Sequence, residues 1–347
     1  MNIPILKTGI IIGLITLLTG CVMPGGTKAG GDALPRELSL AVVDEPNTPV
    51  AEAVTAFDSA IEERSGGSIE VKTEWAATGS YTPHNETDLI HQVQSGAVDL
   101  AVIPTRAFDL TGVTAFRALQ APFVIDSDSL GIAVADSGAA EAMLSRLDGS
   151  GMIGLAMVHE GLRHPVGYPD AIMSPADLAG KTVRVSASQL SQDLFSAFGA
   201  RPTDSNEFNA DLAAGLIDAT EYGFGRNLAP GGTLTSNITF YPKMYALVAN
   251  TATYATLPAG ERSALTRAAA DAAGTPIAQE LPGATEYCAA GGRIEQATAE
   301  QLEAFRVAAD PVMAALLQDP EAASDVEAIQ AMKADLGPVD PAAPPCG

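Results

Sequence analysis

Positive charge is scarce in this sequence, which has 19 lysine and arginine residues against 42 aspartate and glutamate residues. The formal net charge of −23 excludes a general nucleic-acid-binding protein, because neutralising backbone phosphates requires a basic face. The same charge disfavours peripheral attachment to anionic lipid. An acidic surface favours solubility, and it leaves open whether a single buried pocket is basic.

Cysteine and histidine are also rare, with 3 and 4 residues respectively. They form no C-x-x-C pair or Cys/His cluster typical of a metal site. His159 and His164 are separated too widely for the zinc motif H-E-x-x-H, with Gly161 between them. The G-x-S-x-G motif of hydrolases is absent, and Gly223-Phe224-Gly225 lacks the third glycine of a dinucleotide-binding turn. We therefore expect no enzyme, no metal and no cofactor.

A Gly-Lys-Thr triplet lies within Asp177–Val185, DLAGKTVRV. Pro175 stands where a phosphate-binding loop needs its first glycine, and the strand pattern follows the triplet instead of preceding it. A nucleotide site is therefore excluded. In a strand, Arg184 would point away from its neighbours Val183 and Val185. The valines can face a core while the arginine faces a cleft, which makes Arg184 a candidate binding residue.

Long apolar runs are absent apart from Gly9–Leu18 near the N-terminus. This run is shorter than the about 20 residues that span a bilayer, and it has the layout of a secretory signal. The end, Leu18-Thr19-Gly20-Cys21, resembles the lipobox of bacterial lipoproteins, although an ordinary signal with an incidental cysteine is an alternative. We expect residues 1–20 to be a lipoprotein signal peptide, Cys21 to carry the lipid anchor, and residues 21–35 to be a flexible tether. The protein would then be extracytoplasmic and membrane-anchored in the cell envelope.

Two further cysteines, Cys288 and Cys346, would remain after cleavage before Cys21. Disulfides persist outside the cytoplasm, and two cysteines permit one pairing. We predict a Cys288–Cys346 disulfide that holds the proline-rich tail 338–347, with two unpaired thiols as the alternative. Closing this loop would stabilise the fold by about 4 kcal/mol in the chain-entropy model.

Apolar periodicity alternates between strands and helices, which predicts an α/β fold with largely parallel sheets. Strand patterns occupy residues 36–43, 68–75, 98–103, 152–159, 182–185, 219–222 and 245–250. Helix patterns occupy residues 50–65, 86–95, 129–147, 188–198 and 206–214. Beyond Pro258 the chain is mostly helical and alanine-rich.

Five segments occur in an order that is typical of one family. They are AFDSAIEERSGGSIEVKTEW, LIHQVQSGAVDLAVIP, EGLRHPVGYPDAIMSPADLAGKTVRV, DLAAGLIDATEYG and YPKMYALVANTATYATLPAGERSAL. From about Arg36 to Val312 the sequence resembles the extracytoplasmic solute-binding proteins of TRAP transporters (tripartite, ATP-independent, periplasmic), which include C4-dicarboxylate-binding proteins. Each motif alone is weak, and the resemblance depends on all five together.

The resemblance implies a two-lobed fold like that of periplasmic binding proteins, with mainly parallel sheets, a hinge and a long connecting helix. Lobe I would comprise residues 36–160 plus 250–286, and lobe II would comprise residues 161–249 plus 287–347. A ligand would bind in the cleft between the lobes, which would close on it by hinge motion.

The resemblance also assigns site residues. The family's arginine that clamps the substrate carboxylate falls on Arg184, where a guanidinium offers a planar fork of donors; pairing with a surface carboxylate is the alternative. Arg163 falls on a second frequent ligand arginine, or makes a hinge salt bridge. Glu221 matches a glutamate that more often supports the site than touches the ligand. Tyr222 replaces a frequent asparagine, and it either contacts the ligand or fills the core.

Loops at the carboxyl ends of parallel strands face the cleft in such sheets. This nominates Asp44–Thr48, Ala76–Tyr81 and Pro104–Arg106, with Arg106 as a candidate third cation. Trp75 is expected in the core or in the cleft wall.

The implied partners are a small carboxylate ligand and the subunits of a TRAP-type membrane permease, with no nucleic acid. Ligands of the family include C4-dicarboxylates, keto acids, sugar acids and amino-acid derivatives. The alternatives are a binding protein for an ATP-driven importer or sensor, and a degenerate surface lipoprotein without a ligand.

Overall fold

The structure is a computed structural model that describes residues 34–79, 84–205, 207–224, 231–275, 277, 280–337 and 342–346. Residues 35–347 form one compact unit. The predicted signal peptide, Cys21 and residues 21–33 of the predicted tether lie outside the described residues. Within the described ranges, no helix combines the length and the apolar character needed to cross a bilayer.

The N-terminal part of the compact unit is a parallel sheet in which β1 lies between its two neighbours. Its strands are β1 (Arg36–Val42), β2 (Ile69–Trp75) and β3 (Leu100–Pro104). Its connecting helices are α1 (Val50–Ser65) and α2 (Asn85–Ser95). Helix α1 buries the predicted face, including Val54, Phe57 and Ile61, and ends at Gly66, whose φ of 62° suits a glycine. The predicted alternation of strand and helix is confirmed here.

The second part contains a smaller parallel sheet with β5 between β6 and β7. Its strands are β5 (Thr182–Arg184), β6 (Arg201–Thr203) and β7 (Ala219–Tyr222). Its helices are α5 (Pro175–Leu178), α6 (Gln189–Ala197) and α7 (Phe208–Ala213). A further parallel pair joins β8 (Thr233–Thr235) and β10 (Arg293–Glu295). The sequence analysis does not predict β6, β8 or β10, each of which has three residues.

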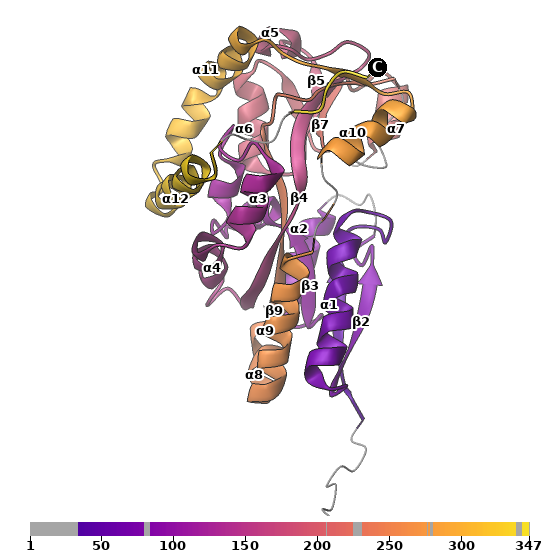
Figure 1. The fold of residues 1–347 in the computed structure, drawn as a ribbon, viewed down its shortest axis with the longest axis vertical. Coiled ribbons are helices and arrows are strands. Elements are labelled where there is room, and N and C mark those ends of the chain that lie inside the picture. The colour runs from indigo at the N-terminus through magenta and orange to yellow at the C-terminus, as the bar shows by residue number, and fades with distance from the viewer. Residues whose placement is uncertain are drawn as a thin grey trace, which may run out of the picture. The chain divides into compact units, whose positions relative to one another are not determined.

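Two long strands, β4 (Met152–Gly167) and β9 (Tyr241–Asn250), connect the two parts. They pair antiparallel, and the strand order β2-β1-β3-β9-β4-β7-β5-β6 places them at the centre (Figure 1). The sequence predicts only the apolar segments 152–159 and 245–250. Strand β4 continues through the polar residues beyond His159 with a register shift before Gly161. The antiparallel pairings of the described strands all involve β4 or β9, and the predicted α/β class is confirmed.

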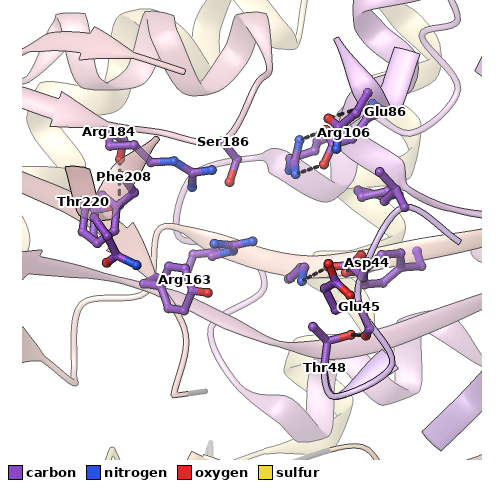
Figure 2. A pocket seen from close by; sticks show the side chains of 17 residues that line it. Asp44, Glu45, Thr48, Glu86, Arg106, Arg163, Arg184, Ser186, Phe208 and Thr220 are labelled. Atoms are coloured by element: carbon purple, nitrogen blue, oxygen red, sulfur yellow. Dashed lines mark hydrogen bonds and ion pairs between the residues drawn. The ribbon is translucent and has the colours of Figure 1, made fainter. Parts of the chain in front are cut away.

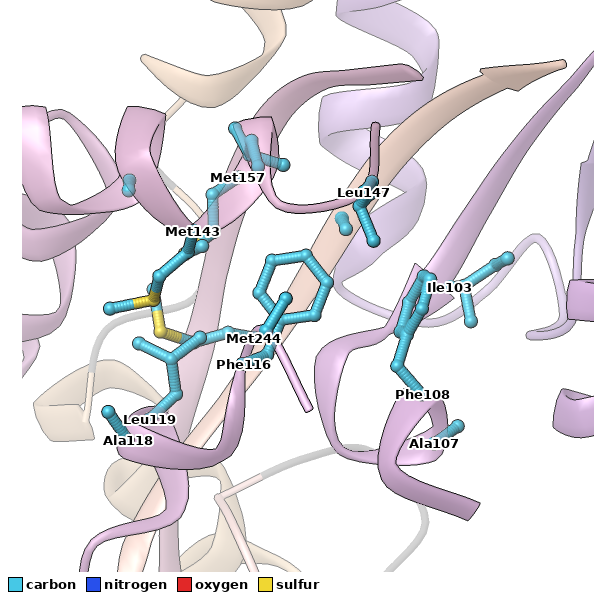
Figure 3. Packing of buried hydrophobic residues seen from close by; sticks show 14 of the residues in the cluster. Ile103, Ala107, Phe108, Phe116, Ala118, Leu119, Met143, Leu147, Met157 and Met244 are labelled. Carbon is cyan, nitrogen blue, oxygen red and sulfur yellow. The ribbon is translucent and has the colours of Figure 1, made fainter. Parts of the chain in front are cut away.

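The predicted helix 129–147 is two helices, α3 (Asp128–Ala135) and α4 (Gly138–Ser145). The Ser137 hydroxyl accepts a hydrogen bond from the Ala140 N–H at 3.3 Å, and this N-cap starts a new helix. Two 3₁₀ helices, η1 (Thr105–Thr111) and η2 (Arg117–Gln120), precede them. Figure 3 shows part of the buried cluster of this region, in which Phe116 lies beside Met244 and Phe108 lies near Ile103.

The C-terminal region is helical, as predicted. Its helices are α8 (Thr251–Thr256), α9 (Ala259–Ala273), α10 (Glu280–Ala289), α11 (Ala299–Leu316) and α12 (Pro320–Leu336). The implied long connecting helix is divided, because α9 ends at Gly274 and α10 begins at Glu280. The sequence between them includes Gly-Thr-Pro, in which glycine and proline both disfavour a continuous helix.

Helix α12 departs from the predicted assignment of residues 287–347 to lobe II. Its residues Val326 and Ile329 join the apolar cluster shown in Figure 3. Arg146, just after α4, donates from Nη2 to the carboxylate of Asp325 at 2.8 Å. Helix α12 therefore packs on α3 and α4, which belong to the segment assigned to lobe I.

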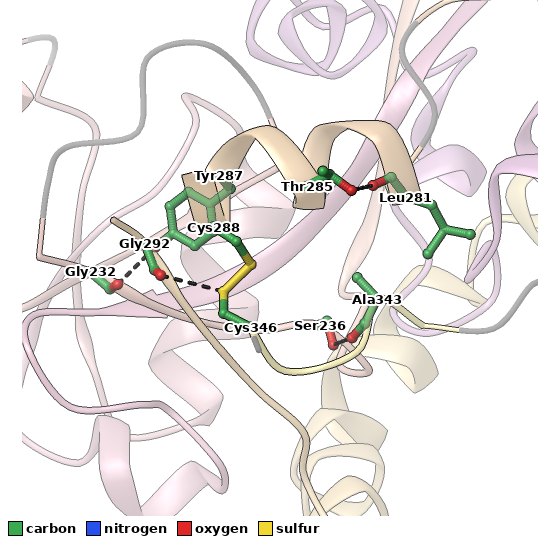
Figure 4. Close-up of a disulfide and its surroundings, with 9 residues drawn as sticks. All are labelled: Gly232, Ser236, Leu281, Thr285, Tyr287, Cys288, Gly292, Ala343 and Cys346. Carbon is green, nitrogen blue, oxygen red and sulfur yellow. Dashed lines mark hydrogen bonds between the residues drawn. A yellow bond between two sulfur atoms is a disulfide. The ribbon is translucent and has the colours of Figure 1, made fainter. Parts of the chain in front are cut away.

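The C-terminal tail is fastened to the fold by a disulfide between Cys288, in the last turn of α10, and Cys346 (Figure 4). Nearby, the Ser236 hydroxyl donates to the carbonyl of the buried residue Ala343 at 2.6 Å. These contacts place the described tail residues beside the β8–β10 pair.

Unreduced protein is expected to have an intact mass about 2 Da below that of the free-thiol form, because forming the disulfide removes two hydrogens. Cys346→Ser should expose one alkylatable thiol at Cys288 and lower the free energy of unfolding by about 4 kcal/mol. The measurements are intact mass, alkylation with iodoacetamide and urea unfolding. Complete alkylation of both cysteines in native, unreduced wild-type protein would contradict the pairing.

Candidate functional site

A cavity of about 230 Å³ lies where the carboxyl ends of β1, β3, β5 and β7 meet the crossing strands β4 and β9. Strand ends of this kind are where α/β sheets place their binding residues. The described residues that line the cavity are Val43, Asp44, Glu45, Thr48, Asn85, Glu86, Pro104, Arg106, Arg163, Arg184, Ser186, Phe208, Asn209, Thr220, Tyr222, Lys243 and Tyr245. Figure 2 shows Arg163 and Arg184 on one side of the cavity, with Arg106 and Asp44 on the other.

Arg184 reaches the cavity because its strand neighbours anchor β5 in the core. Val183 and Val185 are fully buried and pack in an aromatic cluster with Phe195 and Phe240. The side chain of Arg184 therefore takes the opposite face. Its Nε donates to the Ser205 carbonyl at 3.3 Å, and the described part of the chain provides no carboxylate partner for its guanidinium.

The electrostatic surroundings distinguish Arg184 from the other cations. Burial lowers its pKa, and the positive charges of Arg163 and Arg106 act in the same direction, while Glu221 opposes them only in part. Arginine stays protonated despite such a shift. The lowered pKa therefore indicates a desolvated positive charge that an anion would stabilise.

Arg163 lies on β4 and is almost fully buried. One of its Nη atoms lies 3.3 Å from a carboxylate oxygen of Glu221, as an ion pair without hydrogen-bond geometry. The other Glu221 oxygen accepts a hydrogen bond from the Ser186 N–H at 2.7 Å. Burial alone would lower the pKa of Arg163, but the charge of Glu221 raises it overall. Glu221 is fully buried and stands behind the cavity, where it compensates the charge of Arg163 and holds the backbone after β5.

Tyr222, next to Glu221 on β7, lines the cavity. Its ring centre lies 5.5 Å from the guanidinium carbon of Arg163, a distance typical of a cation–π contact. The ring therefore forms part of the cavity wall and contacts the guanidinium of Arg163.

Arg106 is held by a carboxylate of the same half of the protein. Its two Nη atoms each donate to an oxygen of Glu86 at 2.6 Å. Nη1 also donates to the Ala187 carbonyl at 3.0 Å, which lies beyond β5 in the other half. Arg106 therefore links the two halves across the cavity.

Lys243 on β9 is a cation that the sequence reasoning missed. Its Nζ lies 2.8 Å from a carboxylate oxygen of Glu160 and 3.7 Å from one of Asp44. The Tyr245 hydroxyl donates to the second oxygen of Asp44 at 2.7 Å. A single lysine within the apolar segment Tyr241–Asn250 is the same signal that identified Arg184, and it could have nominated this residue.

Two of the three loops predicted to face the cavity contribute residues to it, namely Asp44–Thr48 and Pro104–Arg106. In the third loop, none of the described residues Ala76–Gly79 lines the cavity, and Tyr81 lies outside the described residues. Trp75 packs against the core cluster of the N-terminal sheet. Further lining residues that the sequence did not nominate include Glu86, Ser186 and Phe208. Ser186 follows Arg184 by two positions, so strand periodicity could have found it.

Two relatives show how far the likeness extends in sequence. A solute-binding protein of Verminephrobacter eiseniae (strain EF01-2) is 28% identical over 177 residues, which is 49% of this chain and 50% of that protein. The match therefore spans half the length of that relative. The C4-dicarboxylate-binding periplasmic protein DctP of Rhodobacter capsulatus is 24% identical over 269 residues, which is 71% of this chain and 78% of that protein.

A solved structure shows the same fold. The TRAP periplasmic solute-binding protein of Bradyrhizobium sp. BTAi1, in complex with α/β-D-galacturonate, has a TM-score of 0.73 and 25% identity to this chain. The superposition covers 85% of this chain and 100% of that chain. Because such proteins have two lobes, the predicted two-lobed architecture is confirmed.

The sequence profile of one family covers most of the chain. It is described as "Bacterial extracellular solute-binding protein, family 7" and matches residues 40–319. This range contains every cavity-lining residue named above. It agrees with the expectation of a binding protein without catalytic activity. The chain therefore belongs to family 7 of the bacterial extracellular solute-binding proteins.

Proposed function

We propose that this protein captures a small organic carboxylate in the cavity of Figure 2 and delivers it to a TRAP-type membrane permease. The observation that carries the proposal is Arg184, a desolvated cation that faces the cavity and has no described carboxylate partner. A guanidinium in this state gains most from a carboxylate, because the two planar groups can share two parallel hydrogen bonds. The C4-dicarboxylate and galacturonate in the names of the relatives support the same class of ligand.

The size of the cavity supports a small ligand. Its volume of about 230 Å³ is below the roughly 300–1,000 Å³ of pockets that hold drug-sized molecules. Lining residues such as Asn85, Asn209 and Thr220 supply neutral hydrogen-bonding groups, which suit a polar organic acid.

Capture requires the lobes to close on the ligand. Lobe I is proposed to comprise residues 36–160 with 250–286, and lobe II residues 161–249 with 287–347. Helix α12 is the exception, because it packs on lobe I. Strands β4 and β9 cross between the lobes and are the proposed hinge. The hydrogen bond from Arg106 to the Ala187 carbonyl would then be one contact that closure makes.

Delivery to a TRAP permease is the part of the proposal that depends on the family resemblance. The alternative partners are an ATP-driven importer or a sensor, and a gene for one of these beside the gene for this protein would favour them. A degenerate surface lipoprotein without a ligand is the remaining alternative, and any specific ligand excludes it.

A thermal-shift screen of purified protein against a panel of organic acids tests the proposal. At least one carboxylate should raise the melting temperature, because ligand at about 100 times its Kd stabilises a protein by about 2.7 kcal/mol. Calorimetry then measures Kd, with neutral sugars of similar size as controls. If no carboxylate binds while a neutral compound does, the proposed ligand class is wrong.

Anchoring by Cys21 is a separate proposal with its own test. In cells fed a labelled fatty acid, the wild-type protein should take up label, because lipid is attached at the cysteine that follows the cleavage site. Cys21→Ser should take up none and should be released or left unprocessed, whereas Cys346→Ser, the matched control, should be labelled like the wild type. Equal labelling of Cys21→Ser and wild type would refute the anchor.

A further inference from the structure

The cations on the side of the cavity opposite Arg184 are already neutralised. Arg106 is held by both carboxylate oxygens of Glu86 at 2.6 Å. Lys243 lies 2.8 Å from Glu160. Pairing at these distances leaves little net positive charge for a second anionic group.

Carboxylates are numerous on the same side. Asp44, Glu45 and Glu86 line the cavity there, and Glu160 stands behind the lining beside Lys243. The described lining cations on this side are Arg106 and Lys243, so the four carboxylates outnumber them. The half of the cavity away from Arg184 is therefore rich in hydrogen-bond acceptors.

We propose that the ligand carries one carboxylate, held by Arg184, and hydroxyl groups along the rest of its chain, so that the site selects polyhydroxy monocarboxylates over dicarboxylates. This inference rests on the proposed function and assigns the class of ligand within it. The physical reason is the difference between the two end groups: a hydroxyl can donate a hydrogen bond to a carboxylate, whereas an ionised carboxylate only accepts.

Asp44 is the acceptor that best illustrates this difference. Its two oxygens lie 2.7 Å from the Tyr245 hydroxyl and 3.7 Å from Lys243, and carboxylate oxygens have further lone pairs for a ligand hydroxyl. A second ligand carboxylate would instead place a like charge beside Asp44 in a desolvated site. Such juxtapositions are strongly unfavourable, and we expect dicarboxylates to bind roughly 100-fold more weakly than matched monocarboxylates.

Two pairs of compounds test the selection, because the members of each pair differ only in a terminal CH₂OH or carboxylate. The pairs are D-gluconate with D-glucarate and D-erythronate with meso-tartrate. Calorimetry on the wild-type protein should show tighter binding of the monocarboxylate in each pair that binds. Equal or tighter binding of the dicarboxylate would overturn the inference.

Variants of the acceptor side test the cause. Glu86→Gln releases Arg106 from its carboxylate and should lower the ratio of dicarboxylate to monocarboxylate Kd by about tenfold or more. Asp44→Asn makes the same change of charge at a second position and should act in the same direction, which keeps the test available if one variant fails to fold. Glu74→Gln, on the exposed side of β2, has the same charge change away from the cavity and should leave the ratio unchanged.

The outcomes separate this inference from the proposed function. If no member of either pair binds but another carboxylate in the wider panel does, the inference is overturned and the proposed function stands. Binding of an amino acid such as L-serine alone would likewise overturn it, because an ammonium group would then be the donor to Asp44. If no carboxylate binds at all, both fail. An unchanged ratio in folded Glu86→Gln and Asp44→Asn would refute the electrostatic cause.

Discussion

Arg184→Ala is expected to weaken binding of the carboxylate ligand by roughly 30-fold to several thousand-fold. Truncating one partner of a desolvated charge pair typically costs 2–5 kcal/mol, because the other charge is left buried and unpaired, and about 1.4 kcal/mol corresponds to one decade in Kd. The loss should be near the upper end if the ligand carboxylate has no second cation, since the described carboxylates already engage Arg106 and Lys243. Calorimetry on the best ligand from the screen measures the effect.

Two further variants show whether the effect belongs to the guanidinium. Arg184→Lys should recover little affinity, because an ammonium group cannot provide the planar fork of donors. Arg201→Ala removes an exposed arginine from β6, the strand next to β5, and should leave Kd unchanged. Circular dichroism confirms folding in each case. A folded Arg184→Ala protein whose Kd lies within about threefold of the wild-type value would refute the role of Arg184 as the carboxylate-binding residue.

Much of the fold could be predicted because local patterns and tertiary structure agree in most elements. The faces of α1 and α2, the buried strand β3 and the valines of β5 are all set by apolar periodicity over short windows. Arg184 could be recognised for the same reason. A charged residue between two buried valines must face away from the core, and only a cavity or the solvent can accept it.

Structural features that depend on distant residues could not be predicted in this way. Strand β4 continues past its apolar segment because β9 and β7 pair with it on both sides, and the sequence of β4 alone does not record its partners. The break between α3 and α4 depends on a single serine cap. Helix α12 follows α11 in the chain but packs on α3 and α4 through Val326 and Ile329, so chain order alone did not reveal which elements it contacts.

The ion-pair partners of the charged residues in the cavity could not be predicted from the sequence either. The 42 acidic residues offer many partners for each arginine, and the chain order does not show that Glu86 holds Arg106 while Glu221 faces Arg163. The proposed function depends on these pairings, because they leave Arg184 as the cation of the described cavity lining that has no described carboxylate partner. The sequence could thus nominate the arginines, but only the three-dimensional arrangement distinguishes their roles.

Glu221→Ala is expected to lower the free energy of unfolding by about 3–5 kcal/mol, which is typical when one partner of a buried ion pair is removed. Glu221 is fully buried, and its loss would leave the nearly buried Arg163 without its carboxylate and the Ser186 N–H without its acceptor. Urea unfolding followed by circular dichroism measures the effect. Glu303→Ala, which removes a carboxylate from an exposed pair with Arg306, is the matched control and should change stability by no more than about 0.5 kcal/mol.

Glu221→Gln separates the two contributions of this carboxylate. The amide oxygen of glutamine can still accept from the Ser186 N–H, so this variant removes the charge and keeps the hydrogen bond. If compensation of Arg163 is the main role of Glu221, the glutamine variant should lose nearly as much stability as the alanine variant. Saturating ligand should then restore more stability to it than to wild type, because the ligand carboxylate supplies a new negative charge near Arg163. If Glu221→Gln is as stable as wild type, Glu221 acts mainly through the backbone that carries Ser186, and Arg163 does not depend on it for charge.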